Sequence, residues 1–192
     1  MNFFIGNKEE RLARRLQDGE SDALKDFYTL YADYLTGVCA RYVTDDEDMK
    51  DVFQDSLVHI ISHIQDFKYR SAGSLQAWAT RITVNQSLKY LKDKQHQELA
   101  RLSWDVADDP PEEADDPPVR DIPPEVMQQM IRELPTGYRM VFNLYVFENK
   151  SHQEIADMLG IRKGTSCSQF SRAKNLLAKK ITAYNNSKQQ PR

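Results

Sequence analysis

The sequence predicts an all-α protein in which an extended, acidic, proline-rich linker joins two small helical domains, the second a helix-turn-helix. Apolar residues recur at three- and four-residue spacing through most of the chain, and no segment shows the alternation of a strand. Residues 103–124 differ, with three proline pairs, eight acidic residues and one basic residue. Repeated proline opposes a helix, and like charges keep a chain extended. We therefore expect domains at 1–99 and 123–192 and a linker at 100–122.

The N-terminal domain is expected to contain four helices in succession. A first short helix ends at Gly19, and Ser21 stands where it can cap the second. The second helix carries apolar and aromatic residues at helical spacing: Leu24, Phe27, Tyr28, Tyr31, Leu35, Val38 and Tyr42. Thr44 and Glu47 have the spacing of a capping box, which predicts the start of a third helix. Ser74 begins the fourth, whose core face includes Leu75, Trp78 and Ile82.

The third helix has an apolar side and an acidic side. The acidic side consists of Asp48, Asp51 and Asp55, joined by Gln54. Three interpretations are open: a hydrated helix face, a divalent-metal site, or a surface that docks basic helices of another protein. His59 and His63 stand one turn apart on the same helix, but no third metal ligand accompanies them. We interpret them as surface or interface histidines and expect no metal and no cofactor.

A polar and cationic stripe follows the fourth helix. It consists of Arg81, Asn85, Lys89 and Lys92, and it continues into Lys94. Just before this helix, aromatic and cationic residues alternate at Phe67, Lys68, Tyr69 and Arg70. Stacking surfaces beside phosphate-neutralising groups are what single-stranded nucleic acid requires. A solvated helix face next to core aromatics is an equal alternative.

The C-terminal domain ends in two helices in tandem. Ser151 and Glu154 form a capping box that starts the first helix, and Gly160 stands where a left-handed residue closes it. The second helix places Ser166, Phe170, Ala173 and Leu177 inward. After Asp157 every fixed charge is Lys or Arg, although the whole chain has a net charge of -3. This pattern predicts a helix-turn-helix with a DNA-facing second helix, and the alternative is a merely solvated helical hairpin.

Cysteine content and hydropathy limit the class of protein. Cys39 and Cys167 are too few for a disulfide framework and lack metal-ligand spacing. No apolar run approaches the roughly 18 residues of a membrane-spanning helix. We therefore expect a cytoplasmic protein with no membrane insertion.

Three stretches closely resemble the extracytoplasmic-function (ECF) group of bacterial RNA polymerase sigma factors, in the sigma-70 family. The first is the acidic helix around Asp51, Gln54 and Asp55. The second is the segment 67–91. The third combines 134–142, 151–156, 160–165 and 171–174. The resemblance covers most of the chain, and the order and spacing of the three stretches make it specific.

The resemblance implies a transcription initiation factor that makes no bonds itself, binds core RNA polymerase and promoter DNA, and has an anti-sigma partner. It assigns polymerase docking to Asp48, Asp51, Gln54 and Asp55. Opening and reading of the minus-ten element would fall to Phe67, Lys68, Tyr69, Arg70, Trp78, Arg81, Asn85, Lys89 and Lys92. The minus-thirty-five element would be read by Arg162, Lys163, Thr165, Cys167, Ser168, Ser171, Arg172 and Lys174.

The sequence also departs from the family pattern. Cys167 stands where relatives place a cation, Gln169 is likewise uncharged, and Arg162 occupies the capping position of the second helix, which Ser, Asn or Asp would fill better. In the linker, the acids could imitate RNA near the polymerase active centre or could serve only as a tether. Two alternative functions are a one-component transcriptional regulator and a metal-dependent hydrolase built on the carboxylates near Asp51.

Overall fold

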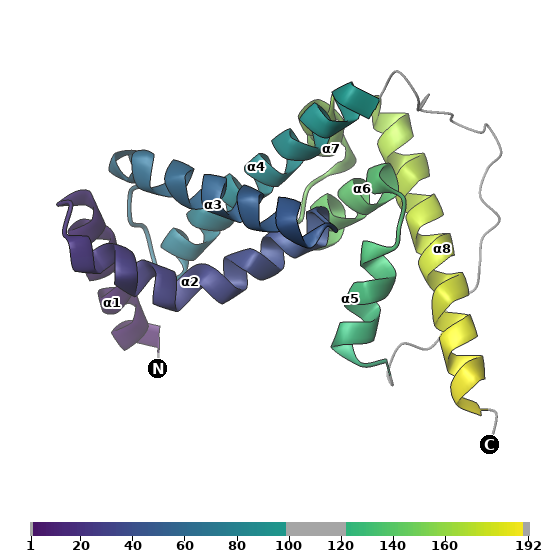
Figure 1. Cartoon of the computed structure of the whole chain (residues 1–192), viewed down its shortest axis with the longest axis horizontal. Coiled ribbons are helices and arrows are strands. Elements are labelled where there is room, and N and C mark those ends of the chain that lie inside the picture. The colour runs from purple at the N-terminus through teal and green to yellow at the C-terminus, as the bar shows by residue number, and fades with distance from the viewer. Residues whose placement is uncertain (1, 99–121, 190–192) are drawn as a thin grey trace. The chain divides into compact units, whose positions relative to one another are not determined.

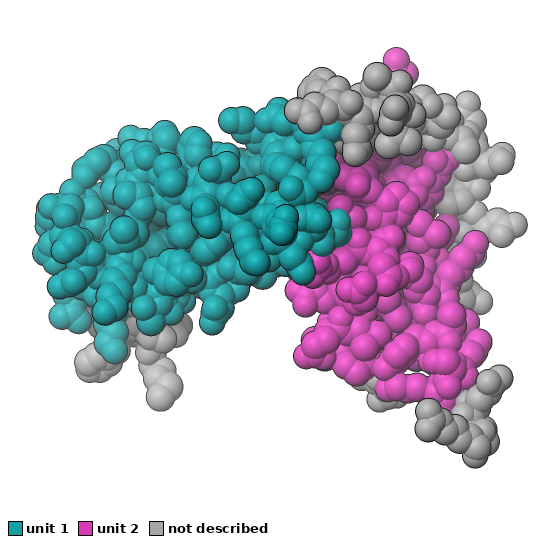
Figure 2. All heavy atoms as spheres, in the orientation of Figure 1, with its two compact units in different colours: residues 1–96 teal, residues 97–192 magenta. Residues whose placement is uncertain are grey.

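The structure, a computed structural model, describes the backbone of residues 2–98 and 122–189. Within these ranges every regular element is a helix and no strand occurs (Figure 1). The chain divides into two compact units, residues 1–96 and 97–192, each with its own core (Figure 2). The predicted all-α class is therefore confirmed. The linker predicted at 100–122 lies almost wholly outside the described residues, so its conformation stays a prediction.

Unit 1 contains α1 (Asn2–Gln17), α2 (Ser21–Tyr42), α3 (Asp46–Ser62), the short 3₁₀ helix η1 (Ile64–Asp66) and α4 (Ser74–Glu98). Gly19 has a φ of 76° and lies between α1 and α2. Glycine adopts this left-handed conformation without a steric penalty, which explains why the first helix ends there, as predicted. Gly73 has a φ of 85° immediately before α4 and makes the corresponding turn.

Two predicted helix caps in unit 1 are wrong. Asp45 is the residue that caps α3, because its side chain accepts hydrogen bonds from the amides of Glu47 and Asp48, both at 3.0 Å. Thr44 lies one residue too early for that role. Ser21 is already the first residue of α2, and Glu20 before it makes no side-chain capping bond. Both helices form where the apolar spacing placed them, but their first turns are stabilised differently.

The core of unit 1 is built from all four long helices. Its fully buried large side chains include Phe27, Leu35, Val38, Tyr42, Ile60 and Leu75. Ser56, Thr83 and Ser87 are also buried, and each hydroxyl donates to the carbonyl four residues earlier, at 2.7 to 3.0 Å. These bonds satisfy the hydroxyl groups and keep small side chains in the core. Leu24 and Tyr28 remain 45% and 52% exposed, so helical spacing alone did not place them in the core.

Unit 2 contains α5 (Pro124–Arg132), α6 (Thr136–Val146), α7 (His152–Leu159) and α8 (Lys163–Gln189). The third proline pair does not extend the linker, because Pro124 is the first residue of α5, where its missing amide costs nothing. The capping box of α7 is confirmed: the Ser151 amide donates to Glu154 at 2.9 Å, and the Glu154 amide donates to Ser151 Oγ at 3.3 Å. Gly160 ends α7 in the left-handed conformation, with a φ of 70°.

Helix α8 organises the core of unit 2. Its middle part packs Ala173, Leu177 and Ile181 against Met130, Ile131 and Leu134. Ser166, Ala173 and Leu177 are buried, as their spacing predicted. Phe170 is partly buried and packs against Phe142 at a ring distance of 6.0 Å. The opposite side of α8 stays accessible, which confirms the amphipathic pattern.

Candidate nucleic-acid interface

The polar stripe of α4 faces solvent along three of its four positions. Arg81, Asn85 and Lys89 are exposed, whereas Lys92 is half-buried. The other side of the helix is buried through Val84, Leu88 and Leu91. Within the described residues, Arg81 and Lys89 form no ion pair. We call Arg81, Asn85 and Lys89 the α4 surface.

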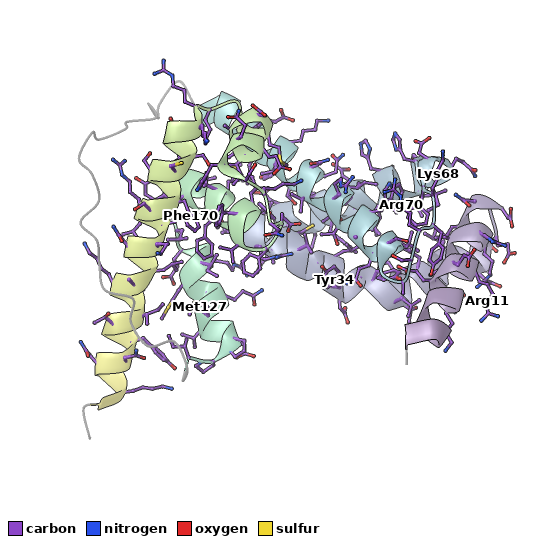
Figure 3. All side chains as sticks on the ribbon, turned by 180° about the vertical axis from the view of Figure 1, so that it is seen from behind. Arg11, Tyr34, Lys68, Arg70, Met127 and Phe170 are labelled. Atoms are coloured by element: carbon purple, nitrogen blue, oxygen red, sulfur yellow. The ribbon has the colours of Figure 1, made fainter. Side chains whose placement is uncertain are left out.

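In the loop before α4, two cationic side chains are exposed and one aromatic ring is buried. Lys68 and Arg70 are exposed on this loop, beside α1 (Figure 3). Phe67 is only 5% exposed and packs against Trp78 with ring centroids 5.3 Å apart. A base therefore cannot stack on Phe67 in this conformation, and the sequence-based assignment of that residue to nucleic-acid contact needs correction. Trp78 is half-buried and keeps one part accessible.

Two residues of α1, Glu9 and Gln17, hold this loop, and neither was predicted from the sequence. Glu9 is buried and accepts hydrogen bonds from the amides of Gly73, Leu75 and Gln76, at 2.5, 3.0 and 3.1 Å. Gln17 donates to the carbonyls of Ile64 and Phe67, at 3.0 and 2.9 Å. Each contact joins residues about fifty or more positions apart. No local pattern in the sequence signals such bonds.

The pKa values of two tyrosines, Tyr31 and Tyr69, are raised by burial and in part by the charge of Glu9. Burial, followed by the Glu9 carboxylate, raises the pKa of Tyr31 to about 12. The Tyr31 hydroxyl donates a long hydrogen bond of 3.4 Å to Glu9. Burial and the charges of Glu9 and Glu10 also raise the pKa of Tyr69 in the loop. Both phenols therefore remain protonated near neutral pH.

The accessible side of α8 contains the predicted DNA-facing residues in two degrees of exposure. Arg162, Lys163, Cys167 and Lys174 are exposed, and Thr165, Ser168, Ser171 and Arg172 are half-buried. We call these residues the α8 surface. Arg162 does occupy the capping position, because α8 begins at Lys163 and the Ser166 amide donates to the Arg162 carbonyl at 3.1 Å. Gln169 is only 7% exposed, so it belongs to the core and does not weaken the contact surface.

An aromatic cluster fixes the start of α8 against α6 and α7. Tyr145 packs on His152 and Phe170 with ring distances of 4.7 and 4.4 Å. His152 Nδ1 lies 3.0 Å from the hydroxyl of the buried Ser166. Burial, followed by the nearby charge of Lys163, lowers the pKa of His152. The neutral imidazole is therefore the form that suits this packing.

The acidic side of α3 is divided by an ion pair. Asp51, Gln54 and Asp55 are exposed, and we call them the α3 surface. Asp48 instead accepts a 2.6 Å bond from Lys94 Nζ, which lies 3.0 Å from the Tyr90 hydroxyl. The bond from Lys94 lowers the pKa of Asp48, and the bond to Asp48 raises the pKa of Lys94. Lys94 is thus paired with Asp48 within unit 1. The prediction that the cationic stripe continues into Lys94 is therefore wrong.

In the described part of the chain, no three His, Cys, Asp or Glu side chains come together as a metal site. His59 and His63 stack on each other at 5.4 Å. Cys39 is buried, and this burial raises the pKa of its thiol to about 11, whereas Cys167 is exposed. None of the helices described is long and apolar enough to span a membrane.

Both units match known sequence families. Residues 27–97 match Sigma-70 region 2, and residues 125–177 match Sigma-70, region 4. The two matches together cover more than half of the chain, and they include the α3, α4 and α8 surfaces. The chain belongs to the sigma-70 family. Known relatives place this sigma factor in the ECF group.

Two relatives resemble this sigma factor over nearly their whole length. The ECF RNA polymerase sigma-E factor of Haemophilus influenzae is 25% identical over 187 residues, which cover 90% of this chain and 95% of the relative. The ECF RNA polymerase sigma factor SigW of Bacillus subtilis is 26% identical, with coverage of 88% and 94%. A solved structure of the sigma factor RpoE with the anti-sigma factor NepR, from Bartonella quintana, is similar in fold. The TM-score is 0.50 at 19% identity, with 82% of this chain and 96% of that chain covered.

Proposed function

We propose that this ECF sigma factor binds core RNA polymerase through the α3 surface and reads one promoter element with each unit. The observation that carries the proposal is that each unit presents an accessible face rich in cations and small polar groups, on α4 and on α8. A protein that reads one operator needs only one such face. The one-component regulator is therefore not favoured.

The α8 surface is suited to the major groove of the minus-thirty-five element. A recognition helix enters the groove with its N-terminal part, and this part of α8 carries Lys163 and lacks acids in its first turn. Lys163, Arg172 and Lys174 would share phosphate and base contacts. Ser168 and Ser171 are short enough to let the helix approach the base edges. The aromatic cluster around Tyr145 holds the start of α8 in place for this contact.

The loop and the α4 surface are suited to the opened minus-ten element. Unstacking a base costs a few kcal/mol, which a preformed pocket and stacking can offset. Asn85 can donate to and accept from a base edge, and Arg81 and Lys89 flank it at one-turn spacing to hold the backbone. Lys68 and Arg70 add charge from the loop. Because Phe67 is buried, we assign it to the support of this pocket and leave stacking to Trp78 and Tyr69.

The α3 surface provides the acidic contacts for polymerase. Asp51 and Asp55 are exposed one turn apart and can face basic helices of the polymerase clamp together. Asp48 is partly neutralised by Lys94, so we expect it to contribute less. Asp48, Asp51 and Asp55 thus form a graded set, in which the ion pair of Asp48 predicts a smaller role for it than for the two exposed acids.

Reconstituted transcription tests this function. Purified protein is added to core RNA polymerase on genomic promoter fragments, and run-off transcripts are mapped. Defined start sites that depend on the protein support the proposal. Asp51→Ala should weaken binding to core polymerase more than Asp48→Ala, because only the first removes an exposed, unpaired contact. Specific binding of duplex DNA without polymerase, together with no run-off product, would instead favour a regulator.

An anti-sigma partner is part of the proposal. It is supported by the fold-level likeness to a sigma factor solved together with an anti-sigma factor. Such a partner should abolish run-off transcription at one-to-one stoichiometry, and additional sigma factor should restore it. Inhibition that excess sigma factor cannot reverse would argue against a stoichiometric inhibitor.

A further inference from the structure

We infer that α1 holds both ends of the loop before α4, and that Glu9 and Gln17 are positioning residues for promoter opening. This inference rests on the proposed function, because it assigns a task to the loop at residues 68–73, which we call the minus-ten loop. Neither residue lies in the segment 27–97 that matches Sigma-70 region 2.

Glu9 supplies the N-terminal cap that α4 lacks. The first turn of α4 contains no acid of its own, and its amides need acceptors. The hydroxyl of Ser74 does not fill this role, because it accepts a long bond of 3.4 Å from the Arg70 amide in the preceding loop. Glu9 instead reaches from another helix and accepts bonds from the amides of Gly73, Leu75 and Gln76. A carboxylate at a helix N-terminus also interacts favourably with the helix dipole.

The burial of Glu9 makes this cap strong and specific. Its residue surface is only 6% exposed, so its carboxylate depends on the three amides and on Tyr31 for hydrogen bonds. A buried acceptor that loses its partners is costly, and charged hydrogen bonds are stronger than neutral ones. The position of Gly73 and the first turn of α4 is thereby tied to α1.

Gln17 ties the other end of the loop to the same helix. Its side-chain amide donates to the last carbonyls before the loop, on Ile64 and Phe67. Gln65 returns a bond of 2.6 Å to the Gln17 carbonyl. Gln17 lies eight residues after Glu9, which corresponds to about 12 Å along a rigid helix. The separation of the two loop ends is therefore set by α1.

The two attachments to α1 should fix the position of the loop cations and of the proposed pocket for the unstacked base. Lys68 and Arg70 lie between the two attached ends (Figure 3). A displaced loop would move these cations and Tyr69 relative to Asn85 on α4. Because capture of an unstacked base needs a preformed pocket, the loss of either attachment should lower both the rate of opening and the preference for one base.

The test compares holoenzymes that carry Glu9→Ala, Gln17→Ala or the control Glu10→Ala. Glu10 is adjacent to Glu9 but lies at the surface in an i, i+4 pair with Arg14. We expect Glu9→Ala to slow open-complex formation on a duplex promoter about tenfold, and Glu10→Ala to leave it unchanged. Gln17→Ala, which removes neutral bonds, should have a smaller effect in the same direction.

Base preference separates positioning from simple loss of fold. Each holoenzyme is used to select from single-stranded oligonucleotides with random bases in the minus-ten element. A lower active fraction leaves the selected base unchanged, whereas a displaced loop flattens the preference. Wild-type preference in both Glu9→Ala and Gln17→Ala would overturn the inference. If Glu9→Ala fails to fold, Gln17→Ala decides the outcome. Failure of the wild type to start transcription at all would reject the proposed function instead.

Discussion

Asn85 and Lys89 allow a paired test of the α4 surface. Both are exposed one turn apart, and both lie between buried positions that hold the helix in place. Alanine has a higher helix propensity than asparagine and a similar one to lysine, so neither substitution should cost more than about 0.5 kcal/mol of stability. Any larger change in promoter use therefore reports on the nucleic acid and not on the fold.

The two substitutions should change different quantities: Lys89→Ala the salt dependence of binding, and Asn85→Ala the discrimination between bases. Lys89→Ala removes one phosphate contact, which should make the slope of log affinity against log salt shallower by about 0.7 to 0.9. Between 50 and 200 mM salt this corresponds to roughly a threefold smaller loss of affinity. Asn85→Ala removes a base contact, which should relax discrimination at one minus-ten position by about 1–3 kcal/mol, or roughly 5- to 150-fold.

The assay is open-complex formation by holoenzyme on a set of promoters with single-base changes in the minus-ten element, repeated over a series of salt concentrations. Lys89→Ala should weaken every promoter evenly, and Asn85→Ala should change the ranking of promoters at one position. Fluorescence of Trp78, in a Trp104→Phe background, checks that unit 1 stays folded. The same uniform loss in both variants, or no loss in either, would refute the assignment of a base contact to Asn85.

Three further predictions concern the stability of unit 2, each followed by hydrogen exchange of its helices. Gly160→Ala should cost about 1 kcal/mol, because a β-carbon there meets nothing within 4 Å and only the left-handed backbone is strained; an unchanged exchange rate in α7 would count against this. Leu144→Ala removes a fully buried side chain and should cost about 2–5 kcal/mol, and a loss below 1 kcal/mol would mean that the core refills the cavity. Burial lowers the pKa of His152, so the unfolded chain binds the proton more readily. Stability is then complete above about pH 6.5 and falls as the pH drops through the folded pKa. His152→Gln should lose this dependence between pH 7.5 and 5, and an identical pH profile in both proteins would exclude His152 as its source.

The sequence correctly predicted those features of the site that depend only on residues close together in the chain. The α7 capping box and the left-handed Gly160 were correct because each involves bonds within four or five residues. The exposed positions of α4 and α8 were largely correct for the same reason, since helical spacing assigns faces. The α3 cap was off by one residue, because Thr44 and Asp45 both satisfy the capping preference and the sequence does not distinguish them.

Contacts between helices were not predictable in this way. Phe67 and Gln169 have a type and spacing that suit a surface role, yet the packing of neighbouring helices buries both. Lys94 continues the cationic stripe in sequence, but it binds Asp48, a residue 46 positions away. Whether a side chain is covered depends on the distance and angle between two helices, and neither quantity is encoded in the periodicity of one of them.

By itself, the sequence determined that this protein is all-helical, that every fixed charge after Asp157 in its C-terminal helix-turn-helix is basic, and that it belongs with the ECF sigma factors. Only the tertiary structure decided which of the expected contact residues remain accessible and that Glu9 and Gln17 of α1 attach both ends of the minus-ten loop. The physical reason is that helix formation and amphipathic faces follow from interactions over three to five residues, whereas these contacts join segments 47 to 67 residues apart and exist only once the helices have packed.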